Sequence, residues 1–227
     1  MPTVLITGAS RGLGLEFARQ YADDGWSVIA SCRQPKKAKS LNAVAGDVTV
    51  MALDVDDLAK VKALARKLKG RGIDVLINNA GIYGPKGLTR DNVDYDAWGR
   101  VFRTNAMSPL AVSAAFAANV AQGRQKKIVT LSSIMGSIDS NTDGKKYIYR
   151  SSKAAVNAVM KSLSLDLAAK GIKVVMLHPG WVRTDMGGPK GAIDAAQSVT
   201  GMRAVIAGLK KSDSGRFLNY EGTEIPW

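Results

Sequence analysis

The chain has 227 residues, of which 46% are hydrophobic, and 32 lysines and arginines against 19 acids give it a formal net charge of +13 at pH 7. This length and apolar content suit one globular domain with a substantial core. No apolar run approaches the roughly 18 residues of a membrane span, the N-terminus lacks signal-peptide features, and the single Cys32 excludes an internal disulfide, so we expect a protein without membrane contact in a reducing, cytoplasmic setting.

Seven short apolar runs alternate with helical patterns along the chain. Apolar residues recur at helical spacing between these runs, for example in 56–69 and 153–169. The alternation predicts an α/β fold of the Rossmann type: a doubly wound, seven-stranded parallel sheet with helices on both faces. Nothing divides the chain, so one domain should span 1–227, with ligands beyond the carboxyl ends of the strands. The predicted strands are 3–7, 27–31, 48–54, 73–81, 127–133, 172–180 and 216–220.

A glycine-rich turn, TGASRGLG at 7–14, follows the first predicted strand directly. Gly8, Gly12 and Gly14 would allow a tight turn and let backbone N–H groups approach a diphosphate at the start of a helix. Glycines also mark ordinary turns, so the motif alone is weak. Its position after the first strand favours a dinucleotide site.

The second predicted strand ends in ASCRQPKK, without an acid. An acid at this place would bind the ribose 2′-hydroxyl of NAD, whereas a base pairs with the 2′-phosphate of NADP. Arg33 stands there, and Arg11 in the glycine turn is a second candidate, although both fit ordinary surface charges as well. We predict NADP(H). Asp54 would bind the adenine amino group or cap the next helix.

Basic residues cluster in two stretches, 33–39 with four bases and 60–71 with six, and neither stretch contains an acid. Such clusters raise the question of nucleic-acid binding. No nucleic-acid motif accompanies them, so we interpret them as a solvated helix face and an attraction for small anions. We expect no nucleic-acid partner.

Tyr149 and Lys153 are four residues apart at the start of a long amphipathic stretch, and no other tyrosine has a lysine four residues later. Positions i and i+4 share one face of a helix. A neighbouring ammonium should draw the pKa of the phenol from about 10 toward working pH and so provide a proton donor. Such pairs also arise by chance on many helices, so neighbouring motifs must decide.

Five motifs occur in a fixed order: TGASRGLG at 7–14, NNAG at 78–81, LSSIMG at 131–136, the Tyr149–Lys153 pair and HPGWVRTDM at 178–186. In order and rough spacing they resemble the short-chain dehydrogenase/reductase family over nearly the whole chain. Within it, the sequence looks most like short carbonyl reductases of the sniffer and C-factor type.

The resemblance implies NADPH-dependent reduction of a small aldehyde or ketone. Tyr149 would be the general acid, and Lys153 would lower its pKa and bind the nicotinamide ribose. Ser133, rather than Ser132, would polarise the substrate carbonyl, because the family serine directly precedes the x-x-G seen at 134–136. Asn105 would support a proton-relay water.

The resemblance also implies a set of cofactor contacts and a short substrate loop at about 184–200, with an open pocket that tolerates varied carbonyl compounds. Trp181, Met135 and Tyr83 would contribute to an apolar wall or to the ordinary core. The implied cofactor contacts are Gly8, Ser10, Arg11, Gly12, Leu13, Gly14, Arg33, Asp54, Val55, Asn79, Ala80, Gly81, Tyr149, Lys153, Pro179, Gly180, Val182 and Thr184.

Three further points stay open at the level of sequence. The sole histidine, His178, has no partner cluster, so we predict no metal site. The resemblance to C-factor implies an alternative function, in which the chain is a dinucleotide-binding regulatory or signalling protein. Relatives include monomers and tetramers, so the resemblance is compatible with a homodimer or homotetramer as well as a monomer.

Overall fold

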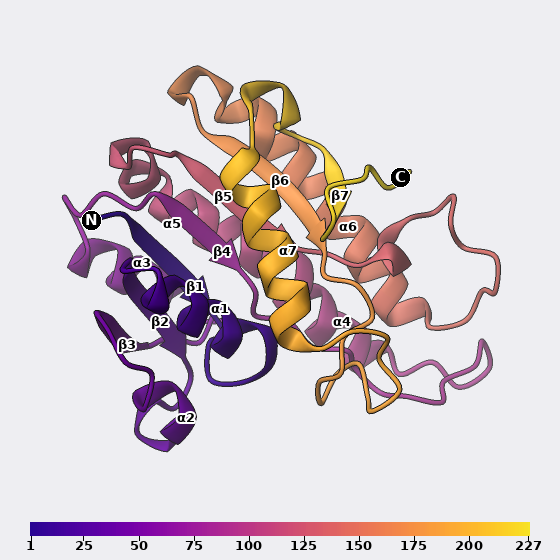
Figure 1. The fold of residues 1–227 in the computed structure, drawn as a ribbon. Coiled ribbons are helices and arrows are strands. Elements are labelled where there is room, and N and C mark those ends of the chain that lie inside the picture. The colour runs from indigo at the N-terminus through magenta and orange to yellow at the C-terminus, as the bar shows by residue number, and fades with distance from the viewer.

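A computed structural model describes residues 1–227 and shows a seven-stranded, wholly parallel sheet (Figure 1). The strand order β3-β2-β1-β4-β5-β6-β7 confirms the predicted doubly wound class. The chain direction across the sheet reverses between β1 and β4, which is where such folds bind ligands. The strands are β1 (Thr3–Thr7), β2 (Ser27–Cys32), β3 (Val48–Ala52), β4 (Val75–Asn78), β5 (Lys127–Leu131), β6 (Lys173–His178) and β7 (Phe217–Asn219).

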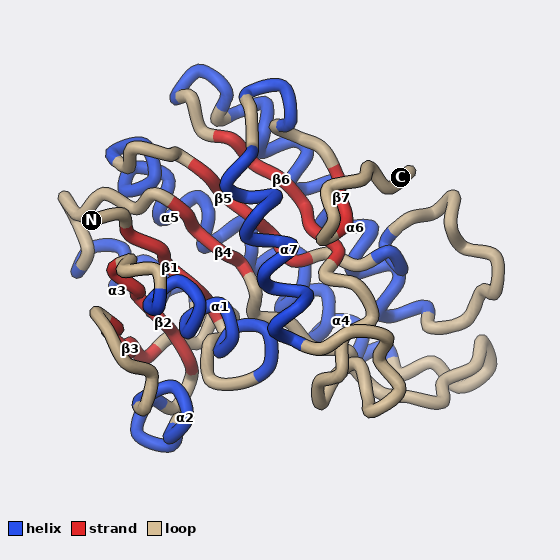
Figure 2. The backbone as a smooth tube through the Cα atoms, viewed as in Figure 1, coloured by secondary structure: helices blue, strands red, loops and turns tan.

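Helices cover both faces of the sheet (Figure 2). Helices α1 and α7 pack side by side on one face, and α3, α5 and α6 cover the other. None of the helices combines the length and apolar character that a membrane crossing requires. Their bounds are α1 (Gly12–Asp23), α2 (Lys39–Asn42), α3 (Leu58–Lys67), α4 (Tyr95–Phe102), α5 (Ser108–Gln122), α6 (Tyr147–Asp166) and α7 (Ala195–Gly208).

The core lies in two layers because successive strand residues point to opposite faces. On β1, Val4 and Ile6 belong to the layer under α1 and α7, whereas Leu5 belongs to the layer under α3, α5 and α6. All three side chains are fully buried. A strand buried on both faces is continuously apolar, which explains the apolar runs of the fully buried strands β1, β2, β4 and β5, whereas the edge strand β3 is only partly buried.

Several strands end earlier than their apolar runs predict. Within the run 73–81 the strand ends at Asn78, and within the run 172–180 it ends at His178. The polar tails beyond these ends become loops at the carboxyl edge of the sheet. The fold therefore places NNAG and PG at the edge where ligands bind.

The predicted substrate loop, about 184–200, is too long at its C-terminal end. Helix α7 already begins at Ala195, because the side chain of Asp194 accepts a hydrogen bond from the backbone N–H of Gln197 at 2.8 Å and so caps the helix. The segment without helix or strand therefore ends at Asp194.

Candidate active site

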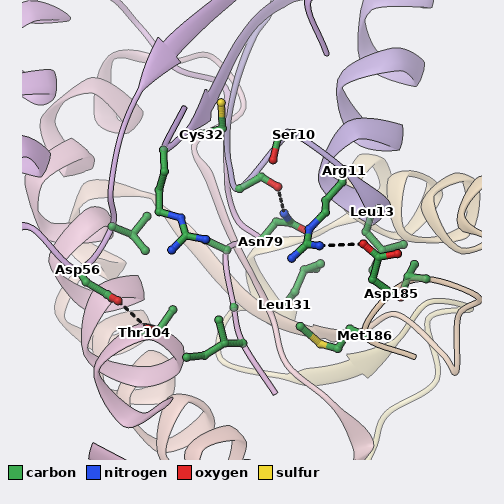
Figure 3. A pocket seen from close by; sticks show the side chains of 18 of the residues that line it. Ser10, Arg11, Leu13, Cys32, Asp56, Asn79, Thr104, Leu131, Asp185 and Met186 are labelled. Atoms are coloured by element: carbon green, nitrogen blue, oxygen red, sulfur yellow. Dashed lines mark hydrogen bonds and ion pairs between the residues drawn. The ribbon is translucent and has the colours of Figure 1, made fainter. Parts of the chain in front are cut away.

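A cleft of about 460 Å³ opens at the carboxyl ends of the strands, across the switch point between β1 and β4 (Figure 3). It brings together most of the predicted site residues. Those in its wall are Gly8, Ser10, Arg11, Gly12, Leu13, Arg33, Asp54, Val55, Asn79, Ala80, Gly81, Tyr149, Lys153, Pro179 and Thr184.

The turn between β1 and α1 is packed too tightly for side chains at its glycines. A Cβ on Gly8, which has a φ of +67°, would lie 2.9 Å from Cα of Ala80, and one on Gly14 would lie 2.4 Å from the Gly8 oxygen. Asn79 holds the turn in place, since its Nδ2 donates to Thr7 O at 2.8 Å and Gly8 O at 3.0 Å. This cradle of backbone at a helix N-terminus suits a diphosphate.

Four arginines line the cleft: Arg11, Arg33, Arg100 and Arg103. Arg11 forms an ion pair with Asp185 at 2.8 Å in which both side chains are 75% exposed, and the two face each other in Figure 3. Arg100 and Arg103 were not predicted from the sequence, where their spacing of three residues at the end of α4 was the only signal. Together these side chains contribute four guanidinium groups to the cleft wall.

Three aspartates follow β3 and have distinct places. Asp57, not Asp54, caps α3 by accepting from the backbone N–H of Lys60 at 3.1 Å, so the capping alternative for Asp54 is wrong. Asp56, also missed, accepts from Thr104 Oγ1 at 2.6 Å. This bond, drawn in Figure 3, ties the β3 loop to the chain segment that carries Asn105. Asp54 itself stays in the cleft wall.

Tyr149 lies in the first turns of α6 and is 8% exposed. Burial raises the pKa of its phenol, and the neighbouring Ser133 side chain lowers it only in part. Desolvation outweighs the expected lowering, so the net shift of this pKa is upward. A phenol with a raised pKa is expected to be protonated at neutral pH.

Lys153 is buried one turn further along α6, with Nζ 5.7 Å from the centre of the Tyr149 ring. Its ammonium donates to the carbonyl oxygen of Leu131 at 2.8 Å. Burial lowers the pKa of Lys153 to about 8. Burial and the charge of Lys153 lower the pKa of His178 to about 4, so this imidazole is neutral at pH 7.

The two serines after β5 differ in what they contact. Ser132 lines the cleft, and its Oγ donates to Asn157 Oδ1 at 2.6 Å. Ser133 Oγ accepts from the Met135 N–H at 3.2 Å and lies beside the Tyr149 phenol. Ser133 is thus the serine directed at Tyr149, although it is not part of the cleft wall.

Asn105 is held in a π-helical turn (Arg103–Met107) between α4 and α5. Its Nδ2 donates to Ile82 O at 2.8 Å and to Ser152 Oγ at 3.0 Å, and its Oδ1 accepts from Ile82 N at 2.9 Å. A Cβ built on Gly81 would lie 3.3 Å from Asn105 Oδ1 and 3.9 Å from Lys153 Nζ, so Gly81 lies between them. Such turns are frequent at functional sites.

A few predicted contacts lie outside the cleft wall. Besides Ser133 and Asn105, these are Gly14, Gly180 and Val182. Gly14 packs under the glycine turn, Gly180 packs against Tyr220, and Val182 is 4% exposed and pairs with Ile193 in an isolated bridge. They support the loops that form the cleft.

Two side chains cover Tyr149, and the sequence analysis treated neither as part of the acid site. The Tyr83 ring stacks on Tyr149 with ring centres 4.5 Å apart, and Met186 Sδ lies 4.0 Å from Tyr149 Oη. Trp181, an expected wall residue, is 55% exposed and donates from Nε1 to Gly187 O. An apolar cover of this kind keeps water from the phenol.

The family model described as short chain dehydrogenase matches residues 2–194. The chain belongs to the short chain dehydrogenase family. This confirms the resemblance carried by the five motifs, and it makes the protein an oxidoreductase of that family.

Three relatives illustrate the likeness. C-signal of Myxococcus xanthus is 47% identical over 167 residues, which cover 74% of this chain and all of that protein. The carbonyl reductase Sniffer of D. melanogaster superposes with a TM-score of 0.93 and 34% identity, over the whole of both chains. An NADPH-bound carbonyl reductase from chicken fatty liver gives a TM-score of 0.91 and 37% identity, over 100% of this chain and 99% of its own.

Proposed function

We propose that the protein reduces an aldehyde or ketone to an alcohol with NADPH as the hydride donor. The observation that carries this proposal is the buried Tyr149 with Lys153 and Ser133 around it, at the inner end of a cleft with a glycine cradle and a basic rim. The solved relatives with a carbonyl reductase title add support, and one of them has NADPH bound.

NADPH fits the residues of the cleft. The cradle at Gly8 and Gly14 leaves backbone N–H groups free of side-chain cover, which suits the diphosphate. Arg33 and Arg11 offer charge-assisted hydrogen bonds to the 2′-phosphate, and Asp54, in the cleft wall, would accept a hydrogen bond from the adenine amino group. When bound, the cofactor supplies the hydride.

The chain's own residues handle the proton. Ser133 binds the substrate carbonyl oxygen, and Tyr149 donates its proton to that oxygen as the carbonyl carbon is reduced. Burial keeps this phenol protonated until that moment. The Lys153 ammonium then stabilises the phenolate that remains, and Asn105 supports the water that returns a proton to it.

The test is a titration of NADPH and, separately, NADH into the protein, followed by aldehydes, ketones and diketones while nicotinamide absorbance is recorded. We expect tighter binding of NADPH and its consumption with several carbonyl compounds. Tyr149→Phe should retain NADPH binding and lose roughly 100-fold or more in turnover. Consumption by Tyr149→Phe at the wild-type rate would overturn the assigned acid.

The second candidate is a dinucleotide-binding signalling role, favoured by the 47% identity to C-signal. The Tyr149→Phe variant separates the two functions. A biological effect that persists in this variant supports signalling through the bound dinucleotide, and an effect that disappears with turnover supports catalysis.

A further inference from the structure

A second cavity, of about 450 Å³, lies at the edge of the sheet opposite the cleft. Its walls come from the beginnings of β5 and β6 and from the C-terminal ends of α1 and α7 (Figure 1). These four elements are far apart in sequence. The cationic and aromatic side chains of its wall are Tyr21, Trp26, Arg124, Lys127, Lys173 and Arg203.

Four of these six side chains are cationic, and the most buried of them is Lys127, at 4% exposed. Lys127 Nζ donates to Gln125 Oε1 at 2.8 Å and to Ala207 O at 3.2 Å. Both acceptors are neutral, and the ammonium has three donors. Burial and the charge of Lys173 lower the pKa of Lys127 to about 8, and the charge of Asp74 offsets this only in part. No carboxylate bonds to this ammonium.

Carboxylates do not neutralise the cavity. Neither Arg124 nor Lys173 has a carboxylate within 4 Å of its charged group. The nearby Asp74 accepts three backbone N–H groups, those of Thr3, Arg124 and Gln125. The charge of Asp74 acts on Lys127, but Asp74 forms no ion pair with Arg124 or Lys173, so these two cations have no direct carboxylate partner.

Arg203 is the one cation of the cavity with an acidic partner, Asp24. Its guanidinium also lies over the Tyr21 ring, 4.5 Å from the ring centre. Its Nε is nevertheless buried without any hydrogen-bond acceptor. An unpaired buried N–H is costly, so the guanidinium of Arg203 is left incompletely satisfied beside the cavity.

The remaining wall is aromatic. Tyr21 and Trp26 meet edge to face with ring centres 4.7 Å apart, and burial raises the pKa of Tyr21 to about 12, so its phenol stays neutral. An apolar, flat surface beside a cluster of cations suits a ligand with an anionic head and a planar body. The volume is in the range of ordinary small-molecule sites.

We propose that this cavity binds a small phosphomonoester. A phosphate dianion compensates more of the four cations than a carboxylate does, and guanidinium groups match phosphate oxygens in geometry. The phosphate would lie among Arg124, Lys127 and Lys173, and the organic part would lie against Trp26. This site is separate from the cleft. The phosphomonoester proposal therefore does not depend on the reductase function proposed for the cleft.

The test is calorimetric titration of phenyl phosphate into the whole protein at fixed ionic strength, with benzoate and inorganic phosphate as comparison ligands. Two double variants locate the binding. Arg124→Gln with Lys173→Gln changes the cavity, whereas Arg11→Gln with Arg33→Gln changes the cleft, the other place that can hold a phosphate. Lys69→Gln with Lys170→Gln is the matched control, since it removes two exposed charges elsewhere.

We expect saturable binding of phenyl phosphate that weakens by roughly tenfold or more in the Arg124/Lys173 variant and is kept in the other two. Inorganic phosphate should bind more weakly, because it lacks the planar part. Loss in the Arg11/Arg33 variant alone would place the ligand in the cleft and overturn the proposal. Absence of saturable binding, or benzoate binding as tightly as phenyl phosphate, would overturn it as well.

Discussion

The ring of Tyr83 stacks on the ring of Tyr149 at a centre distance of 4.5 Å and an angle of 25° between the planes. Tyr83 follows β4, whereas Tyr149 belongs to α6, so the stack joins two sides of the cleft. It both fixes the orientation of the proposed acid and shields the phenol from water. The first prediction follows from this contact.

Replacing Tyr83 with alanine should lower kcat about threefold to tenfold, since an aromatic pair contributes about 0.5–1.5 kcal/mol of ordering. Exposure to water should also lower the pKa of Tyr149, so the alkaline limb of the pH–rate profile should move to lower pH. Tyr83→Phe keeps the stack and is the matched control. A profile unchanged in Tyr83→Ala, or changed equally in Tyr83→Phe, would refute the role of the stack.

Arg33 should determine the choice of cofactor. In Arg33→Asp the 2′-phosphate loses a charge-assisted partner and meets a repelling carboxylate, while the 2′-hydroxyl of NADH gains an acceptor. The ratio of kcat/KM for NADPH to that for NADH should fall roughly 100-fold. Lys36→Asp makes the same charge change at an exposed residue outside the cleft wall. If Lys36→Asp lowers the ratio as much as Arg33→Asp does, the change in preference comes from the overall charge of the protein and not from a contact of Arg33.

Lys153 should reduce stability at neutral pH. Burial lowers its pKa to about 8 in the folded state, while the unfolded chain keeps a value near 10.4. The unfolded state therefore binds more protons between these values, and the stability of the wild type rises with pH across this window. Lys153→Met should be more stable at pH 7 by about 1–3 kcal/mol, and inactive.

The gain in Lys153→Met should be largest below pH 8 and shrink toward pH 10, which thermal unfolding at several pH values would measure. Lys161→Met, on the exposed side of the same helix, is the matched control. A Lys153→Met protein that is less stable at pH 7 would show that the Lys153 bond to Leu131 outweighs the cost of burying the charge.

His178 should make the protein sensitive to acid. Its folded pKa of about 4 lies below the ordinary value of 6.5, so the unfolded state takes up the proton first as the pH falls. Stability should decline by up to about 3 kcal/mol between pH 6.5 and pH 4. Because His178 is the only histidine, His178→Gln should flatten this part of the unfolding curve. An unchanged curve would show that carboxylates cause the decline.

The sequence predicted the sheet well, because strands buried on both faces are continuous apolar runs. It also predicted that Tyr149 and Lys153 share a helix face, since that depends only on local geometry. It did not predict the raised pKa of Tyr149. That property depends on the cover from Tyr83 and Met186, which come from other parts of the chain.

The same limit explains the other omissions. The π-helical turn around Asn105 is fixed by contacts with Ile82 and Ser152 across the fold, and no local pattern marks it. Arg100 and Arg103 become part of the basic rim only because α4 is placed beside the cleft. The second cavity likewise combines four elements whose sequences contain no shared motif.

Strand β5 has one end at each of the two cavities. It begins at Lys127 in the basic cavity and ends at Leu131, whose carbonyl oxygen accepts the hydrogen bond of Lys153. The two ends are roughly 13 Å apart, given the rise of a strand, and ladders to β4 and β6 hold the strand on both sides. The ladders fix Lys127 and Leu131 relative to each other, so the two cavities share one rigid element of the sheet.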